Sequence, residues 1–68
     1  MDIQQLEEKA LNSYFRKAKQ QGVSPSQPDQ TPTIEEVEGV TFITLNNLNG
    51  PLVKYKLTEG ERLLEVDL

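Results

Sequence analysis

The chain of 68 residues contains no cysteine and no histidine. Without cysteine, neither a disulfide nor a cysteine-ligated zinc ion can reinforce a domain whose small core is marginal on its own. Without histidine, the commonest metal ligand and the usual base at neutral pH are both missing. Any acid–base chemistry would therefore depend on carboxylates and lysines.

Long apolar runs are missing too. No apolar run exceeds three residues, far below the roughly 20 needed to cross a bilayer. The first residues, MDIQQLEEK, are acidic and amide-rich where a signal peptide has bases followed by an apolar stretch. The lack of cysteine fits a reducing compartment. We therefore expect a soluble, cytoplasmic protein with no membrane contact.

The net charge of −4 is unevenly distributed. Residues 1–22 carry four bases against three acids, which gives +1, whereas residues 34–68 carry three bases against seven acids, which gives −4. Asp29 supplies the remaining −1. This distribution lacks the strong basic footprint of a nucleic-acid-binding domain.

Residues 1–22 have the pattern of an amphipathic helix. Asp2 and Gln5 have the spacing of a capping box, and Gly22 can adopt the left-handed conformation that ends a helix. Apolar residues recur at intervals of three and four, which is a helical period. They are Ile3, Leu6, Ala10, Tyr14 and Ala18, with Leu11 and Phe15 widening the apolar stripe. The pattern predicts a helix over residues 2–21.

Residues 23–33 form a proline-rich segment, VSPSQPDQTPT, which predicts an extended, mobile linker. The spacing of Pro25, Pro28 and Pro32 also permits a PxxP-like partner motif, although a plain connector uses the same residues.

Residues 34–68 change to a period of two. Glycines at positions 39, 50 and 60 separate the apolar segments IEEV, VTFITL, LVKYKL and RLLEV. Turn signals at this spacing predict an antiparallel meander of three or four strands, and leave open whether the first strand, near Ile34–Val37, forms. The expected fold class is α+β, with the N-terminal helix packed on one face of the meander.

The register of the central hairpin follows from its apolar pattern. A three-residue loop over 48–50, with Gly50 left-handed, pairs Leu45 with Val53 and Ile43 with Tyr55. A two-residue Asn-Gly turn would shift the strands by one residue and mix polar and apolar side chains on both faces. The asparagines at 46, 47 and 49 are therefore interpreted as turn residues.

The outer hairpins are less strongly determined. In the first, around Glu38 and Gly39, either Val37 or Ile34 can point inward. In the last, an even loop around residues 59–60 would set Leu64 beside Tyr55, Val66 beside Val53 and Glu65 opposite Lys54. The expected core is Leu6, Ala10, Tyr14, Ala18, Ile43, Leu45, Val53, Tyr55, Leu57, Leu64 and Val66.

Two segments, MDIQQLEEKALNSYFRKAKQQG and EEVEGVTFITLNNLNGPLVKYKL, joined by the proline linker, resemble a family of small uncharacterised conserved proteins of cyanobacteria. The matching residues are Leu6, Ala10, Tyr14 to Ala18, Phe42 to Leu45, Asn47 to Gly50, and Tyr55 with Lys56. The resemblance spans most of the chain. It implies a shape and a compartment, and it implies no activity and no site residue.

The densest acidic cluster, formed by Glu35, Glu36 and Glu38, is the main candidate for catalysis or cation binding. Strand alternation puts Glu35 and Glu36 on opposite faces, and no phosphate loop, nucleophile elbow or EF-hand spacing accompanies them. A charged edge strand that resists pairing with other chains needs the same residues. We expect no enzyme activity and no cofactor.

A protein-interaction surface is the preferred functional hypothesis. In the expected register Phe42, Lys56 and Leu63 form a row on the sheet face away from the helix, while Leu11 and Phe15 widen the helix stripe. Either surface could contact a protein partner or a second copy of the chain, and a small core gains from self-association. The alternative is a nucleic-acid-associated accessory protein that uses the helix's basic face, formed by Lys9, Arg16 and Lys19.

Overall fold

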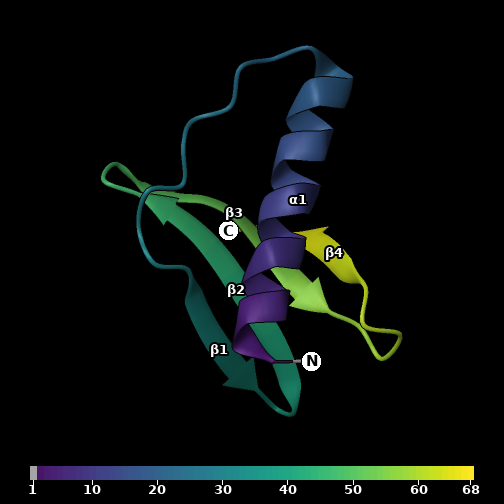
Figure 1. Ribbon diagram of the computed structural model, residues 1–68. Coiled ribbons are helices and arrows are strands. Elements are labelled where there is room, and N and C mark those ends of the chain that lie inside the picture. Colours follow the sequence, from purple (N-terminus) through teal and green to yellow (C-terminus); the bar gives the residue numbers. More distant parts are fainter. Residues whose placement is uncertain (1) are drawn as a thin grey trace.

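A computed structural model describes residues 2–68, in which one helix packs on one face of a four-stranded antiparallel sheet (Figure 1). The elements are helix α1 (Ile3–Gln21) and strands β1 (Thr33–Val37), β2 (Val40–Asn47), β3 (Gly50–Leu57) and β4 (Leu63–Val66). The strands lie in the sheet in the order in which they occur in the sequence. The predicted α+β meander is confirmed, and the first strand, which the sequence left open, is formed.

Helix α1 is closed at both ends by the predicted caps. The Asp2 carboxylate accepts a hydrogen bond from the Gln5 amide at 2.8 Å, and the Gln5 side chain accepts one from the Asp2 amide at 3.4 Å. Gly22 is left-handed, with φ 69°, and the amide of Val23 donates to the carbonyl of Ala18 at 3.1 Å. The backbone groups left unpaired at each helix end are thereby partly satisfied.

The first hairpin turns at Glu38 and Gly39, whose φ angles are 52° and 79°. Two left-handed residues form the tight turn that suits the twist of a two-residue hairpin. Ile34 therefore pairs with Ile43 and joins the core, while Val37 lies on the opposite face and is 51% exposed.

The central hairpin has the predicted pairs, Leu45 with Val53 and Ile43 with Tyr55. Its extra residue, however, is not in the loop.

The strands pair as far as Asn47 and Gly50, so the connecting loop contains only Leu48 and Asn49. Leu52 has no paired residue opposite and forms a bulge in β3. The amide of Asn49 donates to the Asn47 side chain at 2.8 Å, a local bond of the kind that asparagine forms in turns.

The last hairpin differs from the prediction by one residue. Tyr55 pairs with Glu65, and Leu57 pairs with Leu63. Leu63 consequently packs against the core, and the predicted inward positions of Leu64 and Val66 are wrong.

The loop between β3 and β4 explains this shift. The left-handed residue is Glu61, with φ 58°, rather than Gly60. The amide of Thr58 donates to the carbonyl of Arg62 at 2.8 Å, and the Arg62 amide donates to the Thr58 hydroxyl at 3.2 Å. Three residues, 59–61, therefore lie between Thr58 and Arg62, whereas a loop with an even number of residues was predicted.

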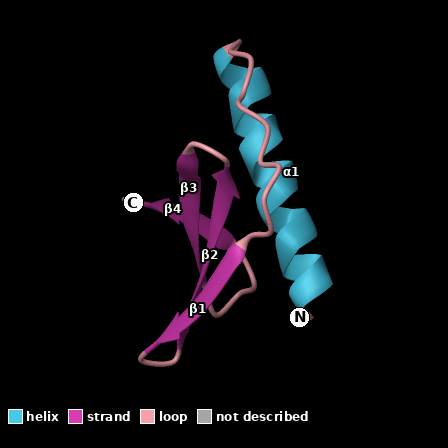
Figure 2. Ribbon diagram, turned by 90° about the vertical axis from the view of Figure 1, so that its left-hand side faces the viewer, coloured by secondary structure: helices cyan, strands magenta, loops and turns pink. Residues whose placement is uncertain are grey.

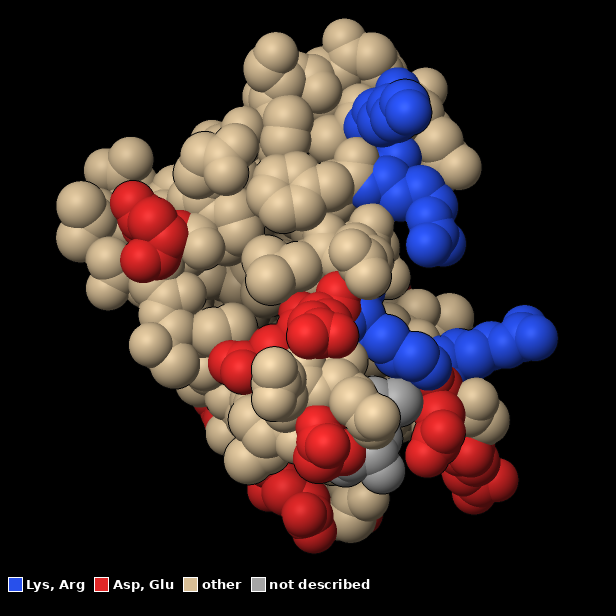
Figure 3. Space-filling model, in the orientation of Figure 1, with Lys and Arg blue, Asp and Glu red and all other residues tan. Residues whose placement is uncertain are grey.

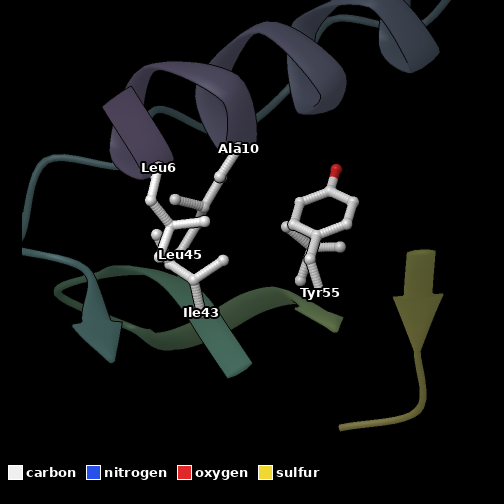
Figure 4. Packing of buried hydrophobic residues seen from close by; sticks show 6 residues of the cluster. Leu6, Ala10, Ile43, Leu45 and Tyr55 are labelled. Carbon is white, nitrogen blue, oxygen red and sulfur yellow. The ribbon is translucent and has the colours of Figure 1, made fainter. Parts of the chain in front are cut away.

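The core lies between α1 and the facing side of β2 and β3 (Figure 4). Among residues 2–68 the buried apolar side chains are Leu6, Ala10, Ala18, Ile43, Leu45, Val53 and Tyr55. Tyr14 and Leu57, both predicted core residues, pack at its edge together with Leu11, Ile34 and Leu63. Ile43 and Leu45 are fully enclosed, so the middle of β2 is the centre of the core.

The proline-rich linker is hydrogen-bonded to the domain near both of its ends. The Tyr14 hydroxyl donates to the Ser26 carbonyl at 2.8 Å, and the Gln30 amide donates to the Asn46 carbonyl at 3.3 Å. The Asn46 side chain also donates to the Thr33 hydroxyl at 3.1 Å. These bonds position the segment that carries the chain from the end of α1 to the start of β1.

Candidate interaction site

The face of the sheet that points away from α1, here called the outer face, is the broadest candidate surface. Figure 2 shows α1 on one side of the sheet, and within residues 2–68 there is no second helix to cover the other side. Side chains that pair across neighbouring strands share a face, so the register identifies the residues on this surface.

One row crosses all four strands in the order Glu35, Phe42, Lys56, Leu64. A second row runs in the order Thr33, Thr44, Lys54, Val66, and Val37 pairs with Val40 beside them. The outer face therefore holds five apolar side chains, which are Val37, Val40, Phe42, Leu64 and Val66. Leu64 is 54% exposed, so part of this apolar surface is open to water.

Phe42 at the centre of the outer face is covered in part by a cation. The Lys54 ammonium lies 4.8 Å from the centroid of the Phe42 ring. A contact of this kind contributes about 0.5–1 kcal/mol where it is exposed, and it leaves the charge available to a partner. The centre of the face is thus both apolar and positively charged.

Charge is arranged asymmetrically across this face. Glu35 lies on β1 at one side, whereas Lys54 and Lys56 lie two strands away on β3. The surface therefore has an acidic side and a basic side separated by Phe42.

The structure places two of the predicted contact residues, Phe42 and Lys56, side by side on the outer face. The predicted position of Leu63 in this row is wrong, because the one-residue shift turns Leu63 toward α1 and puts Leu64 in its place. Lys54 and Val66 on the same face were not singled out. The alternation of Lys54 with Val53 and Tyr55 was the signal that could have identified Lys54.

The other two predicted contact residues, Leu11 and Phe15, belong to α1 and lie apart from the outer face. Leu11 packs against the core. Phe15 is 36% exposed, and its ring meets that of Tyr14 edge to face, with centroids 5.3 Å apart and an interplanar angle of 66°. The predicted residues therefore divide between two separate surfaces.

A hollow of about 290 Å³ separates α1 from the loop between β3 and β4. We call it the basic notch. It is lined by Lys9, Asn12, Ser13 and Arg16 of α1 and by Glu61, Arg62 and Leu63 across from them. The Lys9 ammonium donates to the Glu61 carbonyl at 2.7 Å, which connects the two walls. Figure 3 shows that basic side chains gather at the right of the molecule, on the side of α1, with acidic ones mostly below them and one acidic patch at the left.

The alternative hypothesis, a nucleic-acid contact through this part of the helix, stays a prediction. Of the three residues named for it, Lys9 and Arg16 line the basic notch and Lys19 does not.

The inner face near β4 contains a polar corner. The Lys17 ammonium and the Glu65 carboxylate are 2.7 Å apart, and both side chains are about half exposed. Tyr55 is 4% exposed, and burial, with smaller contributions from Glu65 and Tyr14, raises the pKa of its phenol to about 12. The phenol is therefore protonated at neutral pH and is not a base there.

The acidic cluster is divided as the alternation predicted. Glu35 pairs with Phe42, and its neighbour Glu36 pairs with Thr41, so their side chains lie on opposite faces. Between residues 2 and 68, no three acidic residues gather closely enough to hold a metal ion. The same residues include no helix with the length and apolarity needed to span a bilayer.

Comparison with known proteins gives no relative: no family model, no curated protein and no solved structure matches the chain. The resemblance to the cyanobacterial family therefore stays a prediction.

Proposed function

We propose that this protein is a small, non-catalytic interaction module that self-associates as a homodimer through the outer face of its sheet. The observation that carries the proposal is the row of Phe42, Lys56 and Leu64 on the face that α1 leaves uncovered.

The charges of the outer face favour a second copy as the occupant. Consider two copies stacked with their outer faces together and related by a twofold axis that runs parallel to the strands. In this arrangement the strand order of one copy is reversed relative to that of the other. Glu35 of each copy then lies over the side of the other copy that carries Lys56, while the Phe42 side chains meet near the middle. Opposite charges face each other across such an interface, and like charges do not.

The size of the face predicts a weak dimer. Neighbouring strands lie about 4.8 Å apart, and each residue adds about 3.4 Å along a strand. The paired part of the sheet therefore has a flat area of roughly 300 Å² per copy, without the extra area of the protruding side chains. Stable interfaces bury about 800 Å² per partner. We therefore expect a dissociation constant in the micromolar range or weaker. Even a weak dimer would stabilise so small a domain, because it buries additional apolar surface.

Sedimentation velocity across the micromolar to millimolar range tests the proposal. The wild-type sedimentation coefficient should rise with concentration, and Phe42→Ser should remove that rise. The matched control is Phe15→Ser, which makes the same change on α1 and should leave association intact. A wild-type protein that stays monomeric throughout, or an association lost with Phe15→Ser and kept with Phe42→Ser, would contradict the proposal.

A charge exchange tests the twofold arrangement itself. Lys56→Glu and Glu35→Lys should each weaken association, and the double variant should restore it. Within one copy the two residues are separated by the strand that carries Phe42. Their intramolecular attraction is therefore screened at moderate salt, and recovery in the double variant reports contact between copies.

A further inference from the structure

We propose that the basic notch binds the phosphate group of a small phosphorylated molecule. This site is separate from the outer face, and the proposal does not depend on dimer formation.

The notch concentrates positive charge that the protein leaves uncompensated. Lys9, Arg16 and Arg62 line it against a single acid, Glu61, which gives a local charge of +2 in a chain of net charge −4. Within residues 2–68 neither arginine forms an ion pair, and the bond from Lys9 goes to a neutral carbonyl. An anion would therefore meet charges that are not already neutralised by the protein.

The donors come from both walls of the notch. Lys9 and Arg16 are seven positions apart on one flank of α1, with Asn12 and Ser13 between them, and Arg62 faces them from the loop. Arginine pairs bidentately with phosphate oxygens. A phosphate has three terminal oxygens, so it can accept hydrogen bonds from both walls at once, whereas a carboxylate has two.

The loop wall is fixed before any ligand binds. Glu61 has a left-handed backbone, and the Lys9 ammonium holds its carbonyl at 2.7 Å. The Arg62 amide is bonded to the Thr58 hydroxyl. These contacts fix the backbone position from which the Arg62 side chain extends. Ligand binding therefore has a smaller entropic cost than it would with a disordered loop.

The test is an amide-shift titration of the full chain with inorganic phosphate, and then with glycerol phosphate, at constant ionic strength set by sodium chloride. We expect saturable shifts around Ser13 and Arg62. Arg16→Gln and Arg62→Gln should each weaken binding by about tenfold to a hundredfold, as loss of a charged hydrogen bond predicts. Lys19→Gln, which removes the same charge from an exposed position outside the notch, should change the affinity less than about twofold.

Three results would overturn the assignment. They are shifts that never saturate, an Arg62→Gln variant that binds as well as wild type, and equal losses in all three variants. A single-stranded oligonucleotide that binds more tightly than glycerol phosphate and is weakened equally by Lys19→Gln would show a diffuse basic helix face instead. The monomeric Phe42→Ser variant should bind phosphate like wild type, which separates this test from that of the dimer.

Discussion

The two faces of the sheet are made from alternate residues of the same strands, yet they differ in kind. The inner face presents Ile43 and Leu45, both fully enclosed beneath α1. The outer face presents Phe42 beside two lysines of β3, Lys54 and Lys56, and no helix of residues 2–68 lies over it. The inner face therefore forms the core of the domain, and the outer face is the one that we propose for contact with a second copy.

The position of α1 accounts for the difference. One helix of 19 residues covers one side of a four-stranded sheet, and the linker and strands take up most of the rest. A domain this small buries a limited share of its surface. The dimer proposed above would remove Phe42 from water.

The same substitution on the two faces should have very different effects on stability. Leu45→Ala removes a fully enclosed side chain and should lower the free energy of unfolding by about 2–5 kcal/mol. Leu64→Ala removes a side chain that is 54% exposed and should cost less than about 1 kcal/mol. Urea denaturation at low protein concentration, where the monomer dominates, measures both.

Equal losses of stability in the two leucine variants would contradict the difference between the two faces. That result would mean that Leu64 is buried and that β4 has the register with Leu64 and Val66 directed inward.

The pH dependence of stability gives a second contrast, because the inner face contains a buried phenol. The pKa of Tyr55 is raised from 10.0 to about 12, so the folded protein binds this proton more tightly than the unfolded chain does. The resulting stabilisation is fully present below about pH 10 and is lost as the pH rises through 12. Two pKa units correspond to about 2–3 kcal/mol.

The Tyr55→Phe variant isolates this contribution because it removes the buried hydroxyl and keeps the ring. Urea denaturation from about pH 9 to about pH 12 spans the ordinary pKa of a tyrosine, about 10. Over that span the free energy of unfolding should fall more steeply for wild type than for Tyr55→Phe. Parallel profiles would indicate that the phenol is not desolvated by the inner face.

Much of the inner face could be predicted because independent signals agreed. Asp2, Gln5 and Gly22 marked the helix ends, and its apolar period selected the face toward the sheet. In the central hairpin only one register gathered the apolar residues together, so the pairing of Ile43 and Leu45 was correct even though the extra residue lies at Leu52.

The composition of the outer face could not be predicted as well, because β4 contains two adjacent leucines. Either Leu63 or Leu64 can face inward, and the apolar pattern favours Leu64 because Val66 then follows it. The structure selects Leu63 through the loop geometry and leaves Glu65 on the inner side, where it reaches Lys17. Which leucine faces inward thus depends on the backbone angles at Glu61 and on the contact between Lys17 and Glu65, which are 48 residues apart in the sequence.

The smallest expected change in the free energy of unfolding concerns Glu61, whose backbone conformation determines which leucine lies on the outer face. Glu61 adopts φ 58°, a conformation that costs a side chain about 1–2 kcal/mol and glycine almost nothing. Glu61→Gly should therefore relieve this strain, which offsets the greater freedom of glycine in the unfolded chain and the loss of the Glu61 side chain, and its free energy of unfolding should exceed that of the matched control by about 0.5–1 kcal/mol. The matched control is Glu59→Gly in the same loop. Glu59 is not left-handed, so this substitution relieves no backbone strain and should lower the free energy of unfolding. Urea denaturation at moderate salt, which screens the lost carboxylate charge, distinguishes the two variants. If both substitutions destabilise equally, the left-handed residue is not Glu61, and the assignment of Leu64 and Val66 to the outer face loses its structural cause.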